Sequence, residues 1–172
     1  MKEILIIEDD KKISRIIELQ LKHAGFETIK AFSGREGIEA YHQHPAVDLI
    51  LLDIMLPEVS GYDVLKYIKA QNHHLPIILL TAKDDTSDVV TGFELGADDY
   101  VKKPFSQRLL VERIRALLRR QEAIHSGEVA VTEENKIMER GNLLMDPLRH
   151  SVSWKGLDVS LTVTEFMLLQ AL

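Results

Sequence analysis

Short apolar runs alternate with longer stretches of helical periodicity along residues 1–120, and this rhythm limits the folds that the chain can adopt. The runs are Ile4–Ile7, Phe26–Ala31, Leu49–Leu52, Ile77–Leu80 and Tyr100–Val101. Three of them are continuously apolar, as expected for strands that are covered on both faces. The alternation predicts an α/β fold with a doubly wound, five-stranded parallel sheet.

Helix start and stop signals lie between these runs. Apolar residues recur at helical spacing from Ile13 to Ala24, and Gly25 follows where a left-handed helix end favours glycine. Ser33 and Glu36 have the spacing of a capping box, which predicts a second helix through Ala40. Further helices are expected after Gly61, from about Ser87 to Leu95, and from Ser106 to Arg120.

The composition changes after residue 120. Residues 121–140 lack apolar periodicity and are mostly acidic and polar, which is typical of a solvated linker. Short strands are then expected at Leu143–Met145, Ser151–Trp154 and Val159–Leu161, followed by a helix from Thr164. We therefore expect a domain over 1–120, an acidic linker over 121–140, and an incomplete second domain over 141–172.

Composition excludes several classes of function. The chain has 21 basic and 27 acidic side chains, a net charge of −6, which argues against a protein that mainly binds phosphate backbones. Cysteine is absent, so disulfide frameworks, thiol nucleophiles and thiolate metal sites are excluded. The run at Ile4–Ile7 is too short for a signal peptide or a membrane span, so we expect a cytoplasmic protein without membrane contact.

Polar side chains follow four of the predicted strands. These are Glu8, Asp9 and Asp10 after the first strand, Asp53 after the third, Thr81 after the fourth and Lys103 after the fifth. Ligands of open parallel sheets bind at this carboxyl edge. Oxygen ligands without cysteine favour Mg²⁺ over zinc. A carboxylate can also accept a phosphoryl group when a metal and a cation neutralise the transferring oxygens, and Asp53 is best placed to do so.

Each of these residues also has a structural explanation. The acids after the first strand can favour the dipole of the following helix, and Asp53 can cap a loop. Thr81 can form a local turn, and Lys103 can be a solvated surface charge. The combination of compatible groups at four strand ends favours a functional site.

The motifs that carry these residues resemble a known family. Ile-Ile-Glu8-Asp9-Asp10, Leu-Leu-Asp53-Ile-Met-Leu-Pro57, Leu-Leu-Thr81-Ala82 and Gly96-Ala-Asp-Asp-Tyr100-Val-Lys-Lys103-Pro104-Phe105 resemble the motifs of bacterial response-regulator receiver domains. Asn142-Leu-Leu-Met-Asp-Pro and Leu161-Thr-Val-Thr164-Glu165-Phe166 resemble the start of the winged-helix domain of the OmpR/PhoB subfamily. The resemblance implies a flavodoxin-like receiver with strand order 2-1-3-4-5, followed by a winged-helix fragment.

The resemblance implies a two-component response regulator that controls transcription. Asp53 would accept a phosphoryl group from a sensor histidine kinase. Asp9, Asp53 and the backbone carbonyl of Met55 would bind Mg²⁺, with Glu8 acting through water. Lys103 would pair with the phosphoryl oxygens.

The resemblance also implies a switch and a homodimer. Thr81, next to Ala82 in the phosphate-binding group, would move toward the phosphate, and Tyr100 would turn inward. The signal would reach the face of the fourth helix, fifth strand and fifth helix, where the subfamily dimerises through charge pairs. The positions of these pairs hold Glu94, Asp99, Arg113 and Arg115, and the positions of a third pair hold Val89 and Leu109. We expect a dimer contact that depends less on salt; alternatively, Val89 is a deeper core residue.

Two other functions remain open. A phosphatase or phosphotransferase that forms an aspartyl phosphate usually has a second carboxylate two residues after the nucleophile, where this chain has Met55. We therefore expect no enzyme beyond self-phosphorylation and autodephosphorylation. A phosphorylation-independent module could instead pair with a full-length regulator and block it. No basic recognition helix is present, so promoter DNA is an expected partner of a full-length form alone.

Overall fold

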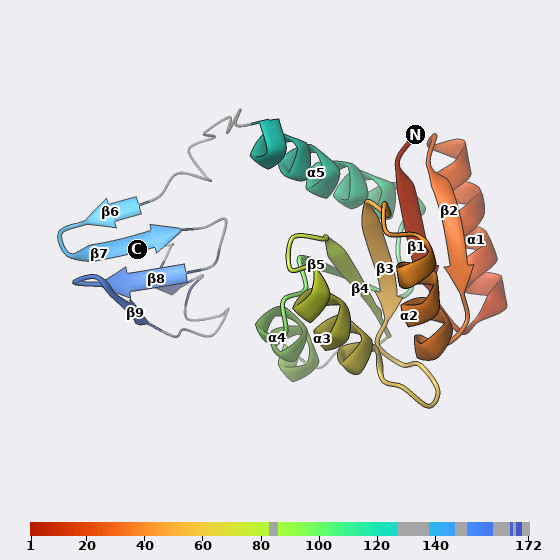
Figure 1. Cartoon of the computed structure of the whole chain (residues 1–172), viewed down its shortest axis with the longest axis horizontal. Coiled ribbons are helices and arrows are strands. Elements are labelled where there is room, and N and C mark those ends of the chain that lie inside the picture. Colours follow the sequence, from red (N-terminus) through yellow and green to blue (C-terminus); the bar gives the residue numbers. More distant parts are fainter. Residues whose placement is uncertain (83–85, 127–137, 147–150, 160–165, 167, 170–172) are drawn as a thin grey trace. The chain divides into compact units, whose positions relative to one another are not determined.

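The computed structural model describes residues 1–82, 86–126, 138–146, 151–159, 166 and 168–169. The chain divides into two compact units, Met1–Glu122 and Ala123–Leu172. The first unit contains β1 (Glu3–Ile7), α1 (Lys11–His23), β2 (Glu27–Ala31), α2 (Gly34–Gln43), β3 (Leu49–Asp53), α3 (Gly61–Gln71), β4 (Ile77–Thr81), α4 (Thr86–Glu94), β5 (Asp99–Lys102) and α5 (Gln107–Ser126), of which the last crosses the unit boundary (Figure 1).

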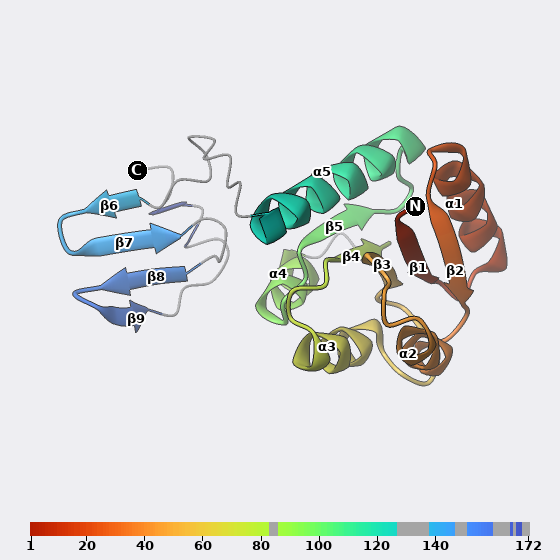
Figure 2. The ribbon, with the colours of Figure 1, turned by 45° about the horizontal axis from the view of Figure 1, so that its top comes forward.

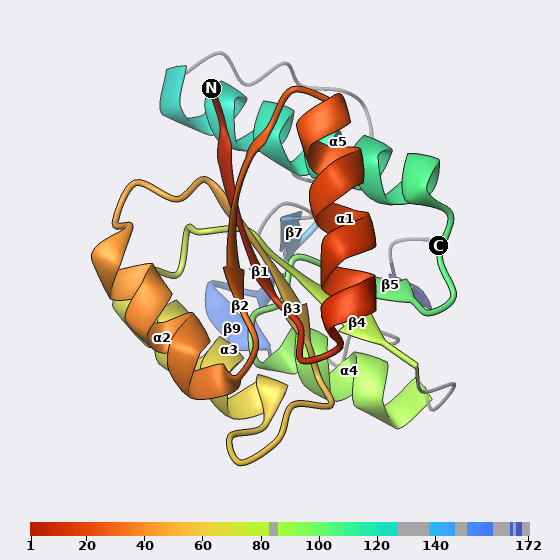
Figure 3. The ribbon, with the colours of Figure 1, turned by 90° about the vertical axis from the view of Figure 1, so that its right-hand side faces the viewer.

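All five strands of the first unit are parallel. They pair in the order β2-β1-β3-β4-β5, which confirms the predicted sheet and its strand order. Helices α1 and α5 cover one face, and α2, α3 and α4 cover the other (Figure 2). Strand β2 is an edge strand that runs between α1 and α2 in the view of Figure 3.

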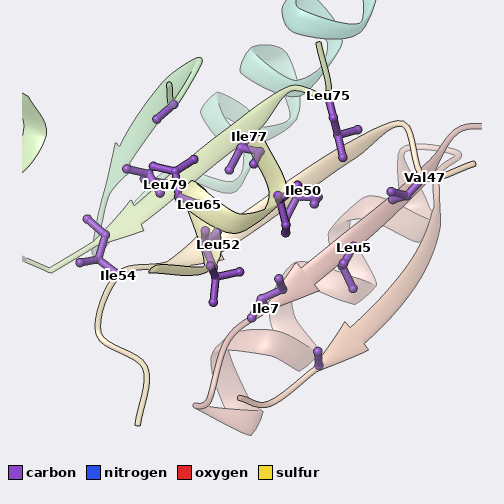
Figure 4. Packing of buried hydrophobic residues seen from close by; sticks show 14 residues of the cluster. Leu5, Ile7, Val47, Ile50, Leu52, Ile54, Leu65, Leu75, Ile77 and Leu79 are labelled. Atoms are coloured by element: carbon purple, nitrogen blue, oxygen red, sulfur yellow. The ribbon is translucent and has the colours of Figure 1, made fainter. Parts of the chain in front are cut away.

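The apolar strands supply two cores, because successive side chains of a strand point to opposite faces of the sheet. In β1, Leu5 and Ile7 belong to the core under α2 and α3. Ile4 and Ile6 belong to the core under α1 and α5. The first core continues through Ile50, Leu52, Ile77 and Leu79 (Figure 4). Two covered faces explain why these strands carry no polar alternation.

Side chains cap the first three helices. The carboxylate of Asp10 accepts from the amides of Lys12 and Ile13 at the start of α1. The hydroxyl of Ser33 accepts from the amide of Glu36 at 3.1 Å, which confirms the predicted cap of α2. Gly25, which follows α1, has a φ of +91°, a conformation that favours glycine.

Helix α5 is longer than predicted. It continues to Ser126, so residues 121–126 are helical rather than part of a linker. Two contacts hold this extension: Gln121 Nε2 donates to the His74 carbonyl at 2.7 Å, and Glu122 lies 3.3 Å from the ammonium of Lys2. These are tertiary contacts, so the local sequence pattern does not reveal them. None of the helices in the described part of the chain is long and apolar enough to cross a membrane.

The second unit contains an antiparallel sheet in the order β6-β7-β8-β9. Its strands are β6 (Met138–Arg140), β7 (Leu143–Asp146), β8 (Ser151–Trp154) and β9 (Leu157–Val159). Strand β6 was not predicted, because three residues are too few to show an alternation. The core of this sheet contains Met145, Val152 and Phe166. The predicted helix start at Thr164 and the end of the last predicted strand lie outside the described residues.

Candidate functional site

The predicted site residues meet at the carboxyl edge of the parallel sheet. Asp53 ends β3 and Thr81 ends β4. Glu8 and Asp9 directly follow β1, and Lys103 directly follows β5. Glu8, Asp53 and Thr81 are buried, whereas Asp9 is exposed to solvent. The fold therefore brings an acidic group, a hydroxyl and a cation to one edge, as the sequence predicts.

Lys103 joins the two buried carboxylates. Its Nζ lies 2.6 Å from Glu8 Oε2 and 3.0 Å from Asp53 Oδ2, and its side chain is 15% exposed. The other oxygen of each carboxylate accepts from the backbone: Asp53 Oδ1 from the amide of Met55 at 3.0 Å, and Glu8 Oε1 from the amide of Asp10 at 3.2 Å. Both acids are thus held in place, and they share one cation.

Burial and the shared cation shift the pKa values of Glu8 and Lys103. Burial raises the pKa of Glu8, the hydrogen bond from Lys103 lowers it and the Asp53 charge raises it, and the net result is a pKa of about 7. Burial lowers the pKa of Lys103, but its hydrogen bonds to Glu8 and Asp53 outweigh burial, so the pKa lies above the ordinary 10.5. Lys103 therefore remains a cation, and Glu8 is the group whose ionisation is costly.

Three carboxylates at this edge could hold a metal ion. Glu8, Asp9 and Asp53 each offer one oxygen, and these oxygens all lie within 4.8 Å of one another. Hard oxygen donors with one solvent-exposed member fit Mg²⁺, which keeps several water ligands. Asp10 has a different role, because its Oδ1 accepts from the amides of Lys12 at 2.8 Å and Ile13 at 3.2 Å. For Asp10, the structure supports the explanation that it stabilises the start of α1.

The predicted switch residues lie on β4 and β5. Thr81 is 1% exposed, and Ala82, which follows it, is exposed. Tyr100 is 37% exposed, and its ring packs edge-on against Phe93 of α4 with the ring centres 5.9 Å apart. Sequence analysis did not identify Phe93 as the neighbour of Tyr100, since nothing in the local pattern links α4 to β5.

The structure pairs two of the predicted interface residues within the chain. Arg113 Nη1 lies 2.9 Å from Asp99 Oδ1 and 2.8 Å from Asp99 Oδ2. Arg115 does not join them: its guanidinium reaches Glu112 at 3.3 Å and the Ala24 carbonyl, at the end of α1, at 3.5 Å. Within the chain, Asp99 and Arg113 thus pair with each other, whereas Arg115 contacts Glu112 and the end of α1; the predicted pairs across a dimer stay a prediction.

The remaining predicted interface residues lie on α4 and α5. Glu94 is exposed, and Leu109 is 47% exposed although it is apolar. Val89 is half-buried. An exposed leucine on α5 is compatible with an apolar contact, while the partial burial of Val89 leaves both of its explanations open.

The receiver-domain family of response regulators matches residues 4–115 of the chain. Among curated proteins, the transcriptional regulatory protein CpxR of Escherichia coli (strain K12) is 40% identical over 174 residues, covering 100% of this chain and 72% of CpxR. The response regulator ArlR of Staphylococcus aureus (strain MW2) is 37% identical over 172 residues, covering 100% of this chain and 73% of ArlR.

Solved structures give the same result. The receiver domain of the Francisella response regulator 1452 has a TM-score of 0.65 and 35% identity, covering 70% of this chain and 98% of that domain. The response regulator DrrB of Thermotoga maritima, an OmpR/PhoB homologue, has a TM-score of 0.64 and 31% identity, covering 100% of this chain and 72% of DrrB. The strand order, the acidic edge and these similarities establish that the chain belongs to the response-regulator family, among regulators of the OmpR/PhoB type.

Proposed function

We propose that this protein accepts a phosphoryl group on Asp53 from a sensor histidine kinase and regulates transcription through the resulting change of its surface. One observation carries the proposal: the buried carboxylate of Asp53 stands at a strand end, 3.0 Å from the ammonium of Lys103. Glu8 and Asp9 stand beside it. A carboxylate with a neighbouring cation and further acidic oxygens is the chemistry that an aspartyl phosphate requires.

In the reaction, an oxygen of Asp53 forms a bond to phosphorus while the bond between phosphorus and the donor breaks. Lys103 neutralises negative charge on the transferring oxygens. Asp9, Asp53 and the carbonyl of Met55 would hold Mg²⁺, with Glu8 acting through water, and the ion supplies further neutralisation when it is bound. The product carries about two negative charges in place of the single charge of the carboxylate, and it places three phosphoryl oxygens at the sheet edge as hydrogen-bond acceptors.

A turnover enzyme of this chemistry usually has a second carboxylate two residues after the nucleophile. The residue two positions after Asp53 is Met55, whose side chain is apolar and exposed. It can neither protonate a leaving group nor activate water. We therefore expect uptake of one phosphoryl group from a kinase or a small phosphodonor, followed by slow autodephosphorylation.

The added charge would act on α4, β5 and α5. The Thr81 hydroxyl would move toward the phosphate and Tyr100 would turn inward, a shift between two conformations of the same chain. The homodimer would use the face of α4, β5 and α5 that carries the predicted interface residues Val89, Glu94, Asp99, Leu109, Arg113 and Arg115. The Asp99–Arg113 pair within the chain would have to open or be shared for a partner to use it.

The second unit gives the proposal its link to DNA. Strands β6 to β9 and the helical residue Phe166 would form the beginning of a winged-helix domain. The chain spans 72% of CpxR. Promoter DNA is proposed as a partner of a full-length form, and control of transcription would require a cytoplasmic protein.

The proposal is tested by the intact mass of the chain after incubation with Mg²⁺ and acetyl phosphate. The expected result is one added phosphoryl group on the native chain, none on Asp53→Ala, and none in EDTA. Asp63→Ala, which removes an exposed acid of α3, is the matched control and should accept the group. An unmodified native chain, or equal modification of Asp53→Ala, would contradict the proposal. The first outcome would favour a module that acts without phosphorylation.

A further inference from the structure

Gly61 lies against the backbone of the acceptor residue. It is the first residue of α3, and a Cβ atom built on it would overlap the Asp53 carbonyl oxygen and lie 2.6 Å from Ile54 Cα. Both atoms belong to the main chain, so rotation of a side chain cannot relieve the overlap. Any side chain at position 61 therefore has to displace either α3 or the peptide that follows Asp53.

Hydrogen bonds hold the two peptide groups on either side of Ile54. The amide of Ile54 donates to the Leu80 carbonyl of β4 at 3.1 Å, and the Ile54 carbonyl accepts from the amide of Gly61 at 3.0 Å. The side chain of Ile54 is buried in the core under α2 and α3. The segment directly after the acceptor is thus fixed between β4 and the first turn of α3, and Met55, whose amide binds Asp53, follows it.

The loop between β3 and α3 takes an unfavourable conformation to bring Gly61 back to Asp53. Glu58 has a φ of +64°, which side-chain-bearing residues rarely adopt. Around it, the amide of Val59 donates to the Pro57 carbonyl at 2.7 Å and closes a three-residue turn. Ser60 then caps α3 by accepting from the amide of Tyr62. A tight turn followed by a cap places Gly61 under the acceptor.

From this geometry we infer that Gly61 is a positioning residue: its missing side chain lets α3 close on the Asp53–Ile54 peptide and so fixes the acceptor carboxylate and the Met55 carbonyl. The inference rests on the proposed function of Asp53. The alternative is that Gly61 serves helix packing alone. In that case its replacement would lower stability without changing the affinity for Mg²⁺.

Gly92 provides a matched control on another helix. A Cβ atom at Gly92, in α4, would overlap Leu79 Cδ1, which is the far end of a flexible side chain. The methyl group added by Gly92→Ala is the same as that added by Gly61→Ala. It meets an atom that can move, and it is not placed against the acceptor backbone.

The experiment compares Gly61→Ala and Gly92→Ala with the unvaried chain. Circular dichroism and a thermal transition report folding, calorimetry reports the affinity for Mg²⁺, and intact mass reports the rate of phosphoryl uptake. We expect folded Gly61→Ala to lose at least ~10-fold in Mg²⁺ affinity and in uptake rate, the scale seen when a residue that orients metal ligands is lost. Gly92→Ala should keep both. Folded Gly61→Ala with unchanged Mg²⁺ affinity would overturn the inference.

A second variant and a second measurement cover the case in which Gly61→Ala does not fold. Adding Glu58→Gly to Gly61→Ala lets the loop adopt other conformations and should restore part of the Mg²⁺ affinity. Hydrogen exchange of the unvaried chain should find the amides of Ile54 and Gly61 as protected as those of β3. Rapid exchange at both amides would overturn the inference. If the unvaried chain neither binds Mg²⁺ nor accepts a phosphoryl group, the proposed function is wrong, and the exchange data still decide whether Gly61 holds this peptide.

Discussion

Two glutamates are buried in the first unit, and their surroundings shift their ionisation in opposite directions. Burial raises the pKa of Glu8 to about 7, and Glu8 shares its one cation, Lys103, with Asp53. Hydrogen bonds from Lys30, Lys22 and Arg15 lower the pKa of Glu18 to about 2. The side chain of Glu18 is 6% exposed, and its three partners lie at 2.9, 2.9 and 2.7 Å respectively.

The difference distinguishes a structural acid from a functional one. Glu18 bridges α1 and β2. Three cationic side chains contact its single carboxylate, so a further cation would not stabilise it. Glu8 and Asp53 are two carboxylates that share one cation, so a divalent cation bound at the carboxyl edge would stabilise them. Burial alone does not identify the site; the ratio of cations to buried acids does.

The largest expected difference between variants of Glu8 and Glu18 is in their affinity for Mg²⁺. Glu8→Gln removes a charge from the acidic edge, and we expect the affinity for Mg²⁺ to fall ~10- to 100-fold. Glu18→Gln lies outside that edge and should leave the affinity unchanged. Calorimetry on both variants measures the effect. Equal losses for the two variants would mean that Mg²⁺ affinity follows overall charge or stability rather than the local ligands.

Stability should respond in the reverse order. Glu18→Gln leaves three cations without their shared carboxylate, and we expect the free energy of unfolding to fall by about 1–3 kcal/mol. Glu27→Gln, which neutralises an exposed acid of β2, is the control and should change it by less than about 0.5 kcal/mol. Urea denaturation measures both values. The structural role of Glu18 would be refuted by a loss no greater than that of the control.

The two glutamates should also give opposite dependences on pH. The folded-state pKa of Glu18 lies below its ordinary 4.5, so its contribution is complete above pH 4.5 and is lost as the pH falls toward about 2. The folded-state pKa of Glu8 lies above 4.5, so the folded chain without metal holds a proton that the unfolded chain has released. Its free energy of unfolding should therefore decrease from about pH 4.5 to about pH 7.

Unfolding in EDTA across this range tests the prediction for Glu8. Glu8→Gln cannot ionise at this position and should remove that part of the decrease, so the variant should gain stability relative to the native chain as the pH rises. Adding Mg²⁺ to the native chain should oppose the decrease, because the ion favours the carboxylate form. A native chain and a variant with the same dependence on pH would show that Glu8 does not titrate in this range.

The smallest effect is expected at an exposed ion pair. Arg113 and Asp99 lie as close together as the partners of Glu18, but the Arg113 side chain is 41% exposed. Water screens such a pair, so Asp99→Asn should change the free energy of unfolding by less than about 1 kcal/mol. Thermal unfolding at low and high salt measures this contribution. A loss as large as that of Glu18→Gln would mean that burial is not what makes the Glu18 cluster strong.

The sheet and the composition of its acidic edge could be predicted from the sequence. Continuous apolar runs locate the strands, and in a parallel sheet the residue after each run lies at a common edge. This places Glu8, Asp53, Thr81 and Lys103 together without any knowledge of side-chain geometry. The predicted end of α5 was wrong because tertiary contacts to Lys2 and His74, which no local pattern contains, stabilise its last turns.

Other features depend on distances that no local pattern contains. The spacing of Arg15, Glu18 and Lys22 permits two ion pairs along one helix, but Lys30 belongs to β2 and is brought near by the fold. The contact of Gly61 with the Asp53 backbone depends on the path of the loop between them. The contact of Arg115 with the Ala24 carbonyl, at the end of α1, likewise depends on the packing of α5 against α1.

The apolar side chains of β3 do not by themselves fix its register in the sheet, and the charged residues at the acidic edge do. Strand β3 is buried along its whole length, so shifting it by one residue against its neighbours would exchange its two faces without exposing an apolar side chain. The native register pairs Asp53, the last residue of β3, with Leu80, the residue before the end of β4. A shifted strand would carry Asp53 away from Lys103 and leave a charge without its partner, which is costly in a buried position. The charged residues of the site thus also favour one register of the sheet over others of nearly equal energy.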